Sequence, residues 1–228
     1  MQVGPAKMMR VNDAHSVSTL WQCPPRAAAC FVFAHGAGAG MRHAFMEAFA
    51  TGVAARGIAT LRFQFPYMER GLRRPDPPPL CHATVRAAVA EAARRTDVPL
   101  FAGGRSFGGR MASQAQAEQP LPGVKGLAFL GFPLHPAKQP SIERAEHLSN
   151  ITIPMLFLQG TRDELAELDL LEPVISRLGK QATLRLSQDA NHAFHVPART
   201  GRTDEQVLEG LIDSFTDWTG SIAAQPRS

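Results

Sequence analysis

The fold is decided in residues 98–109, which read Val98-Pro99-Leu100-Phe101-Ala102-Gly103-Gly104-Arg105-Ser106-Phe107-Gly108-Gly109. The apolar first half predicts a buried strand, and the Ala- and Gln-containing residues that follow predict a helix. At the junction, Gly104, Ser106 and Gly108 match G-x-S-x-G, the pattern of a sharp strand-to-helix turn that exposes a serine hydroxyl. Glycine is needed on both sides because a Cβ there would collide with neighbouring backbone. Ser106 is therefore a candidate nucleophile.

Short apolar runs alternate with longer amphipathic stretches along the rest of the chain. Continuous apolar runs predict parallel strands covered on both faces, and their alternation with helices predicts right-handed crossovers. The segment 73–79 contains four prolines and predicts a stiff extended loop. We expect strands at 17–22, 30–34, 59–63, 100–103, 126–131, 154–158 and 182–186, and helices at 43–56, 80–95, 107–118, 164–178 and 204–219. The sequence thus predicts an α/β fold with a mostly parallel central sheet of about seven strands, helices on both faces, and a single domain over residues 1–228.

Composition limits the classes of partner. The chain has 228 residues, of which 44% are hydrophobic and 19% charged, and this excludes disordered and fibrous proteins. The net charge is +4 and no run of like charges exceeds two residues, so we expect no nucleic-acid partner. The longest apolar run, 27–34, has eight residues, whereas a membrane span needs about 18. We expect no membrane association, and the lack of a signal peptide predicts a cytoplasmic protein.

The cysteine and histidine patterns predict neither a metal nor a cofactor. The three cysteines, Cys23, Cys30 and Cys81, form no C-x-x-C pair and cannot all be paired within the chain. We therefore expect neither a disulfide framework nor a structural zinc site. The natural compartment for such a chain is a reducing one. His195 follows His192 by three residues, but no third ligand stands near them in the sequence.

Two later loops contain a carboxylate and an imidazole. Asp163 follows the expected strand 154–158, and His192 follows the expected strand 182–186. The carboxyl ends of parallel strands share one edge of the sheet, where catalytic groups gather. We interpret Ser106 as the nucleophile, His192 as its base and Asp163 as the acid that orients the base. The runner-up acid is Asp189, which has no strand end of its own.

A glycine-rich loop predicts an oxyanion hole. The residues His35-Gly36-Ala37-Gly38-Ala39-Gly40 follow the expected strand 30–34, and small side chains let backbone N–H groups approach an oxyanion. The expected donors are the amides of Phe107 and Ala37, with Gly38 as the second choice for the loop donor. The same glycines do not match G-x-G-x-x-G, because residues 41 and 43 are not glycine, so nucleotide binding is not expected.

Taken together, these blocks resemble a known family. Residues 34–38, 62–67, 103–110, 159–163 and 191–194 are similar to small bacterial α/β-hydrolases of the dienelactone-hydrolase-like branch. That branch includes the hydrolase-like domain of the NSL-complex regulatory subunit and its testis-expressed relative. The resemblance runs from Ala34 to the final helix and implies an α/β-hydrolase fold with Ser106, His192 and Asp163 as its triad. The chain departs from the branch in two ways: true dienelactone hydrolases use a cysteine nucleophile, and Asn191 stands where many relatives have Asp.

We expect a serine hydrolase acting on a small ester or related acyl substrate. The alternatives are a hydrolase-fold interaction protein with an idle triad, and an acyltransferase using the same triad. Residues 132–153 leave room for one short helix and no separate lid domain. The proline-rich loop would then cover the site. The candidate substrate-binding residues are Arg73, Arg74, Arg105 and Tyr67. The alternative for the arginines is that they are solvated surface residues.

Overall fold

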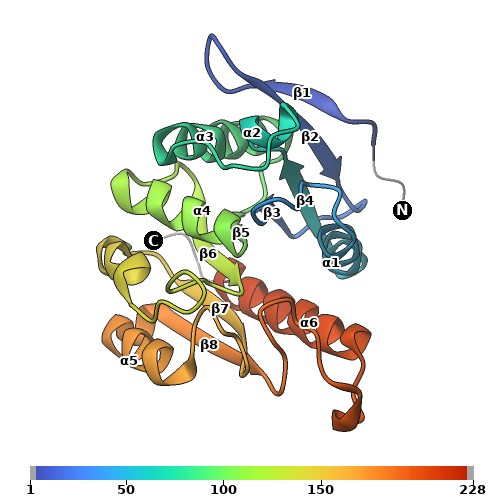
Figure 1. Cartoon of the computed structure of the whole chain (residues 1–228). Coiled ribbons are helices and arrows are strands. Elements are labelled where there is room, and N and C mark those ends of the chain that lie inside the picture. The colour runs from blue at the N-terminus through green and yellow to red at the C-terminus, as the bar shows by residue number, and fades with distance from the viewer. Residues whose placement is uncertain (1–3, 225–228) are drawn as a thin grey trace.

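An eight-stranded sheet forms the centre of the computed structural model, which describes residues 4–224 (Figure 1). The strand order is β1-β2-β4-β3-β5-β6-β7-β8. The pairings β1–β2 and β2–β4 are antiparallel, and all pairings from β4 to β8 are parallel. The strands are β1 (Lys7–Arg10), β2 (Ser16–Gln22), β3 (Ala29–Ala34), β4 (Ile58–Phe63), β5 (Leu100–Arg105), β6 (Val124–Leu130), β7 (Met155–Gly160) and β8 (Ala182–Ser187).

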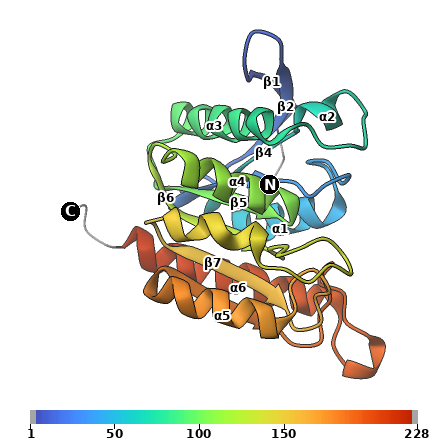
Figure 2. The ribbon, with the colours of Figure 1, turned by 60° about the vertical axis from the view of Figure 1, so that its left-hand side comes forward.

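Helices cover both faces of the sheet, as the sequence predicts. On one face lie α1 (Ala44–Ala55) and α6 (Asp204–Ala223). On the other face α3 (Pro78–Arg95), α4 (Phe107–Glu118) and α5 (Leu168–Leu178) follow one below another in Figure 2, with the 3-10 helix η1 (Glu143–Asn150) between α4 and α5. Each face has its own cluster of buried apolar side chains. The predicted α/β fold is confirmed.

The central strands are buried along their whole length. Every residue of β3, β4 and β7 is buried, as expected for parallel strands covered on both faces, and this includes the polar side chains of Arg62 and Gln159. The core under α1 and α6 is aromatic. The ring centroid of Phe31 in β3 lies 4.6 Å from that of Phe215 in α6 and 6.4 Å from that of Phe49 in α1. These rings fix both helices on the sheet.

Several elements differ from the expectation. The sequence does not predict β1, the eighth strand, because only one of its four residues, Met9, is buried at this edge of the sheet. The extended loop predicted at 73–79 ends at Pro77, since Pro78 and Pro79 start α3, where a missing N–H is harmless. The helix expected from residue 164 begins at Leu168. Three short elements are also new: α2 (Pro66–Glu69), η2 (Gly179–Gln181) and η3 (Ala198–Thr200).

The connection between β6 and β7 is short. Residues 131–154 contain η1 and its flanking loops, and no separate lid domain is inserted there, as predicted. Within residues 4–224, the helices are all too short or too polar to cross a bilayer.

The aromatic core allows a test of how α6 is held. Replacing Phe215 with Ala removes a fully buried ring and leaves a cavity beside Phe31, so we expect the free energy of unfolding to fall by about 3–5 kcal/mol. The matched control is Met8→Ala, at an apolar side chain that is 63% exposed, with an expected change within about 0.5 kcal/mol. Urea denaturation followed by fluorescence measures both. Equal effects of the two substitutions would contradict this account of the core.

Candidate active site

Three side chains from three loops form a chain of hydrogen bonds. Ser106 follows β5, Asp163 follows β7 and His192 follows β8, so all three stand at the carboxyl edge of the sheet. The hydroxyl of Ser106 donates to Nε2 of His192 at 2.8 Å, and Nδ1 of His192 donates to Oδ2 of Asp163 at 2.7 Å, in the tautomer that this pairing requires. The structure therefore brings together the three residues singled out in the sequence, and it pairs His192 with Asp163 instead of Asp189.

The turn at Ser106 has an unusual backbone conformation. Its φ is 47° and its ψ is −116°, and a non-glycine residue held there stores strain on the order of 1–3 kcal/mol. A Cβ at Gly104 would lie 2.2 Å from the carbonyl oxygen of Ala34, and one at Gly108 would lie 2.5 Å from that of His35. Both glycines are therefore required for β3 to pass this close to the turn.

The carboxylate of Asp163 is buried and held by three donors. It is only 2% exposed. Besides His192, Nε2 of Gln159 donates to Oδ2 at 2.5 Å, and the amide of Leu165 donates to Oδ1 at 2.8 Å. The carboxamide oxygen of Gln159 in turn accepts from the amide of Phe132 at 2.9 Å. Gln159 thus ties the acid to the loop after β6, a contact that the sequence alone does not reveal.

The loop that carries His192 is fixed by Asn191. The side-chain oxygen of Asn191 accepts from the amides of Ala193 at 2.9 Å and His195 at 3.1 Å. The side-chain oxygen of Asn191 thereby holds the loop. An Asp at this position would offer the same kind of acceptor. The amide of Arg162 also donates to the carbonyl oxygen of Ala190 at 2.9 Å, so the acid loop and the base loop are joined directly.

Two residues whose backbone amides have no acceptor among the described residues line the pocket beside Ser106. Ala37 and Phe107 line the same pocket as the serine, and Phe107 is the first residue of α4, so its N–H has no acceptor within the helix. In the described part of the chain, neither amide has a hydrogen-bond acceptor. The amide of Gly38, the second choice in the sequence, instead donates to the hydroxyl of Tyr67 at 3.2 Å. Ala37 and Phe107 are therefore the amides available to an oxyanion.

Tyr67 has a different place from the one expected. Its side chain is fully buried, and burial raises the pKa of its phenol. Because its hydroxyl accepts from Gly38, it holds the glycine-rich loop and does not face the pocket. This corrects its prediction as a substrate-binding residue. Tyr67 lies on the short helix α2, which the sequence does not predict, and it is one of the two buried residues of that helix.

His35 anchors the other end of the glycine-rich loop. Its Nδ1–H donates to the carbonyl oxygen of Gly36 at 2.7 Å, and its Nε2 accepts from the amide of Phe65 at 3.1 Å. Burial lowers the pKa of His35 to about 4, which keeps the ring neutral and able to accept that bond at neutral pH. The ring therefore has a structural part in the loop.

The pocket beside Ser106 is a cavity of about 410 Å³. Its walls come from the glycine-rich loop, the loop before α3, the start of α4 and η1. The polar and charged residues in its lining are Asp76, Ser106, Arg110 and Arg144. A pocket of this size, without a lid domain above it, fits a small substrate.

The arginines of the pocket are not the ones expected. Arg73 and Arg74 are exposed and do not line the cavity, and the guanidinium of Arg105 stacks at 4.5 Å over the ring of Phe45, also outside the lining. Arg110 and Arg144 take their place. Arg110 could have been found in the sequence, since it lies four residues after Ser106 on one helix face. Arg144 could not, because its position depends on how η1 packs on α4.

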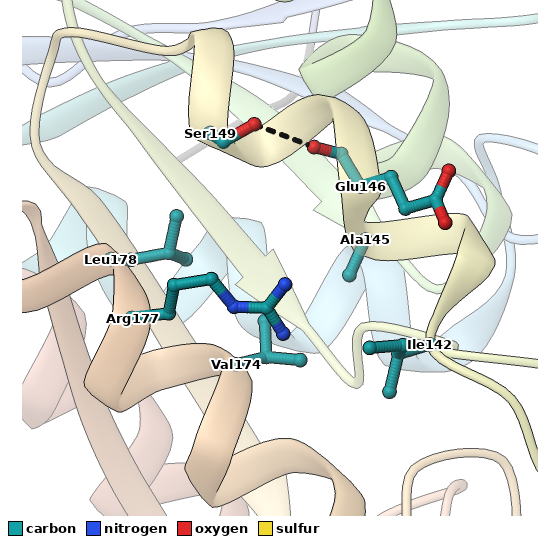
Figure 3. A pocket seen from close by; sticks show the side chains of 7 residues that line it. All are labelled: Ile142, Ala145, Glu146, Ser149, Val174, Arg177 and Leu178. Carbon is teal, nitrogen blue, oxygen red and sulfur yellow. Dashed lines mark hydrogen bonds between the residues drawn. The ribbon is translucent and has the colours of Figure 1, made fainter.

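A second hollow lies between η1 and α5 (Figure 3). It measures about 240 Å³ and has Ile142, Ala145 and Val174 on its walls, with Glu146 and Arg177 at its sides. Neither Ser106 nor His192 lines it, so it is separate from the candidate active site.

Residues that could bind metals are scattered. Across residues 4–224, no group of three or more His, Cys, Asp or Glu side chains is arranged to hold a metal ion. His195 binds the carboxylate of Asp204 at 2.9 Å. Cys30 and Cys81 are buried and Cys23 is exposed, and all three are free thiols.

Comparison with known proteins identifies the family. A family model described as "Alpha/beta hydrolase domain" matches residues 27–220. The chain belongs to this family. The α/β-hydrolase membership that the resemblance implies is thus confirmed, while the dienelactone-hydrolase-like branch and the relation to the NSL-complex subunit stay predictions.

Solved structures share the fold of this hydrolase domain. XC6422 from Xanthomonas campestris, described as an α/β serine hydrolase without lid, has a TM-score of 0.74 and 20% identity, and the match covers 97% of this chain and 96% of that one. A dienelactone hydrolase from Anabaena variabilis has a TM-score of 0.77 and 20% identity, covering 97% and 98%. The esterase domain of a Rhodothermus marinus protein has a TM-score of 0.75 and 14% identity, covering 98% and 100%. At these identities the likeness establishes the fold alone.

The strain at Ser106 can be measured by comparing two substitutions. Ser106→Gly and Ser106→Ala both remove the hydroxyl, but glycine adopts a positive φ at little cost. We expect the Gly variant to be more stable than the Ala variant by about 1 kcal/mol in urea unfolding. The control is Ala87→Gly inside α3, where the same exchange should destabilise by about 0.5–1 kcal/mol. A Gly variant at position 106 that is less stable than the Ala variant would contradict the strain.

The buried ring of His35 and the partly buried ring of His147 predict a pH dependence of stability. Burial lowers the pKa of each to about 4, below its value in the unfolded chain. Between the pKa of the folded chain and that of the unfolded chain, the unfolded state therefore binds more protons than the folded state. The free energy of unfolding should fall as pH drops from about 6.5 to about 4. Urea unfolding at pH 7, 6, 5 and 4.5 measures the slope. Replacing His147 with Asn should reduce the slope, and an unchanged slope in this variant would contradict the account.

Proposed function

We propose that the chain is a serine hydrolase that cleaves a small ester or a related acyl substrate through an acyl-enzyme. The observation that carries this proposal is the unbroken hydrogen-bond chain from Asp163 through His192 to Ser106, at the mouth of a pocket lined by two available amides. Structural neighbours named as an esterase domain and a dienelactone hydrolase support the class of reaction.

In the first step Oγ of Ser106 attacks the carbonyl carbon of the substrate. Nε2 of His192, 2.8 Å away, takes the hydroxyl proton as the new bond forms. The ring then carries a positive charge, which the buried carboxylate of Asp163 stabilises from the Nδ1 side. Gln159 and Leu165 hold that carboxylate in place. Asp163 thus selects the tautomer in which Nε2 can accept a proton.

The negative charge of the tetrahedral intermediate needs donors that are in place before the reaction. The amides of Phe107 and Ala37 supply them, because each lines the pocket and has no competing acceptor in the described residues. Removing one such donor in comparable sites slows turnover by about 10²–10³. The bond that the Gly38 amide donates to the hydroxyl of Tyr67, together with the bonds of His35, holds the loop that contains Ala37.

Collapse of this intermediate releases the alcohol, which receives its proton from His192. Water then attacks the acyl-enzyme with His192 as its base, and the acid product leaves. An acyltransferase would differ only in using another acceptor in place of water. The open, lid-free pocket gives water direct access to Ser106 and therefore favours hydrolysis.

Activity-based labelling tests the nucleophile. A fluorophosphonate probe should label the protein at one position, and peptide mapping should assign it to Ser106. Ser106→Ala should abolish labelling, while Ser141→Ala, at a serine in the loop before η1, should leave it unchanged. A folded wild-type protein that stays unlabelled would favour the interaction protein over the enzyme.

The supporting pair gives a second test. His192→Ala should reduce kcat about as much as Ser106→Ala, because the three residues act as a unit. Asp163→Asn should reduce kcat by about 10³–10⁴, since an amide favours the wrong tautomer of His192. The control is Asp189→Asn, which should stay within about threefold of the wild type. Steady-state hydrolysis of a short ester measures all four variants. Loss of activity in the Asp189 variant alone would contradict the assignment of the acid.

A further inference from the structure

Two guanidinium groups line the pocket of Ser106 without a carboxylate partner. Arg110 comes from α4 and Arg144 from η1. Across residues 4–224, no Asp or Glu oxygen lies within salt-bridge distance of either one, and neither side chain donates a hydrogen bond to a described residue. Two other arginines are buried to a similar degree: Arg62 lies 3.8 Å from the carboxylate of Glu47, and Arg105 lies over the ring of Phe45, outside the pocket.

The lack of a counter-ion has a cost because both groups are partly buried. Nε of Arg110 is fully buried and has no hydrogen-bond partner. Burial and the nearby charge of Arg144 both lower the pKa of Arg110, so the two positive charges repel each other in the absence of an anion. A bound anion would relieve the repulsion and take up the free donors through charge-assisted bonds.

The other ionisable groups at the pocket do not cancel this charge. Asp76 lines the cavity, and its Oδ1 binds Arg70 at 2.5 Å, which offsets its charge, while its Oδ2 is buried and has no hydrogen-bond partner among the described residues. His147 lies near Arg110, and its Nε2 is hydrogen-bonded to the hydroxyl of Ser113 at 2.7 Å. Burial lowers the pKa of His147 to about 4, so the ring is neutral at pH 7. The pocket therefore keeps the positive charge of Arg110 and Arg144.

We propose that the acyl substrate carries a carboxylate that binds Arg110 and Arg144 while Ser106 attacks its ester carbonyl. This inference rests on the proposed function and specifies its substrate class. Arg110 lies one helical turn after Ser106, and its backbone amide donates to the carbonyl oxygen of Ser106 at 3.1 Å. One turn is about 5.4 Å, and both side chains line the same small cavity, so we expect a short chain between the carboxylate and the ester. The planar fork of a guanidinium suits a carboxylate, which it can bind through two parallel hydrogen bonds.

Two isosteric esters test the charge. Monoethyl succinate carries a carboxylate, and ethyl succinamate carries a neutral carboxamide of the same shape. We expect kcat/KM for monoethyl succinate to be higher by about tenfold or more, with the ratio falling at high salt. Arg144→Gln and, separately, Arg110→Gln should bring the ratio close to one. The matched control is Arg73→Gln, which removes an exposed arginine of the neighbouring loop and should keep the ratio.

Each outcome decides the matter. Equal turnover of the two esters by the wild type, or a ratio that survives both substitutions, overturns the carboxylate site and leaves the hydrolase standing. A third ester, ethyl 3-phosphonopropanoate, separates the two anions: if it is turned over faster than monoethyl succinate, the site is a phosphate site and the carboxylate proposal is wrong. Melting curves of the Arg variants identify any that fail to fold, and the other variant then decides.

A succinate-binding experiment tests the anion site independently of the proposed hydrolase activity. Succinate should bind Ser106→Ala protein, measured by calorimetry, and bind at least about tenfold more weakly when Arg144→Gln is added. If neither ester is cleaved but succinate binds in this Arg144-dependent way, the anion site stands and the hydrolase proposal fails. If succinate does not bind and the esters are cleaved without preference, the anion site fails alone.

Discussion

The backbone of Ser106 is held at φ 47° and ψ −116°, and the rest of the site depends on this turn. The sheet itself holds it there, because the amide of Ser106 donates to the carbonyl oxygen of Leu130 in the neighbouring strand β6 at 3.0 Å. β3 passes on the other side, against glycines where any Cβ would collide. The turn aims the hydroxyl at His192 and presents the first amide of α4 to the same pocket. The local strain is thus offset by the packing of the three central strands.

Several hydrogen bonds between loops hold the acid and the base, whereas part of the pocket wall comes from segments outside these loops. The acid and base loops are joined by the bonds from Thr161 to Ser187 at 3.1 Å and from Arg162 to Ala190 at 2.9 Å. Gln159 adds a link from the acid to the loop after β6. The pocket wall combines both kinds of segment: Phe107 and Arg110 follow Ser106 on α4, while Asp76 and Arg144 come from the loop before α3 and from η1. Different members of the fold could therefore change these outer segments without disturbing the hydrogen-bond chain.

Sequence patterns predicted the fold and the three side chains of the hydrogen-bond chain, because these depend on local order. Continuous apolar runs mark buried parallel strands, and each strand end fixes the loop that follows it. Contacts set by side-chain direction could not be predicted. The side chain of Tyr67, on the four-residue helix α2, is buried, and its hydroxyl accepts a hydrogen bond from the amide of Gly38. Arg144 lines the pocket because η1 packs beside it. Edge strand β1 was missed because it buries a single side chain, which gives no periodic pattern.

The most direct measurement of the central claim is a crystal structure of the protein after reaction with a small phosphonate ester. The account predicts one adduct, on Oγ of Ser106, with the phosphonyl oxygen within hydrogen-bond distance of the amides of Phe107 and Ala37. His192 should remain between Ser106 and Asp163, and the amide of Gly38 should stay on Tyr67. A phosphonyl oxygen bound elsewhere, or an adduct on another residue, would contradict the claim that this turn and these two amides form one reacting centre.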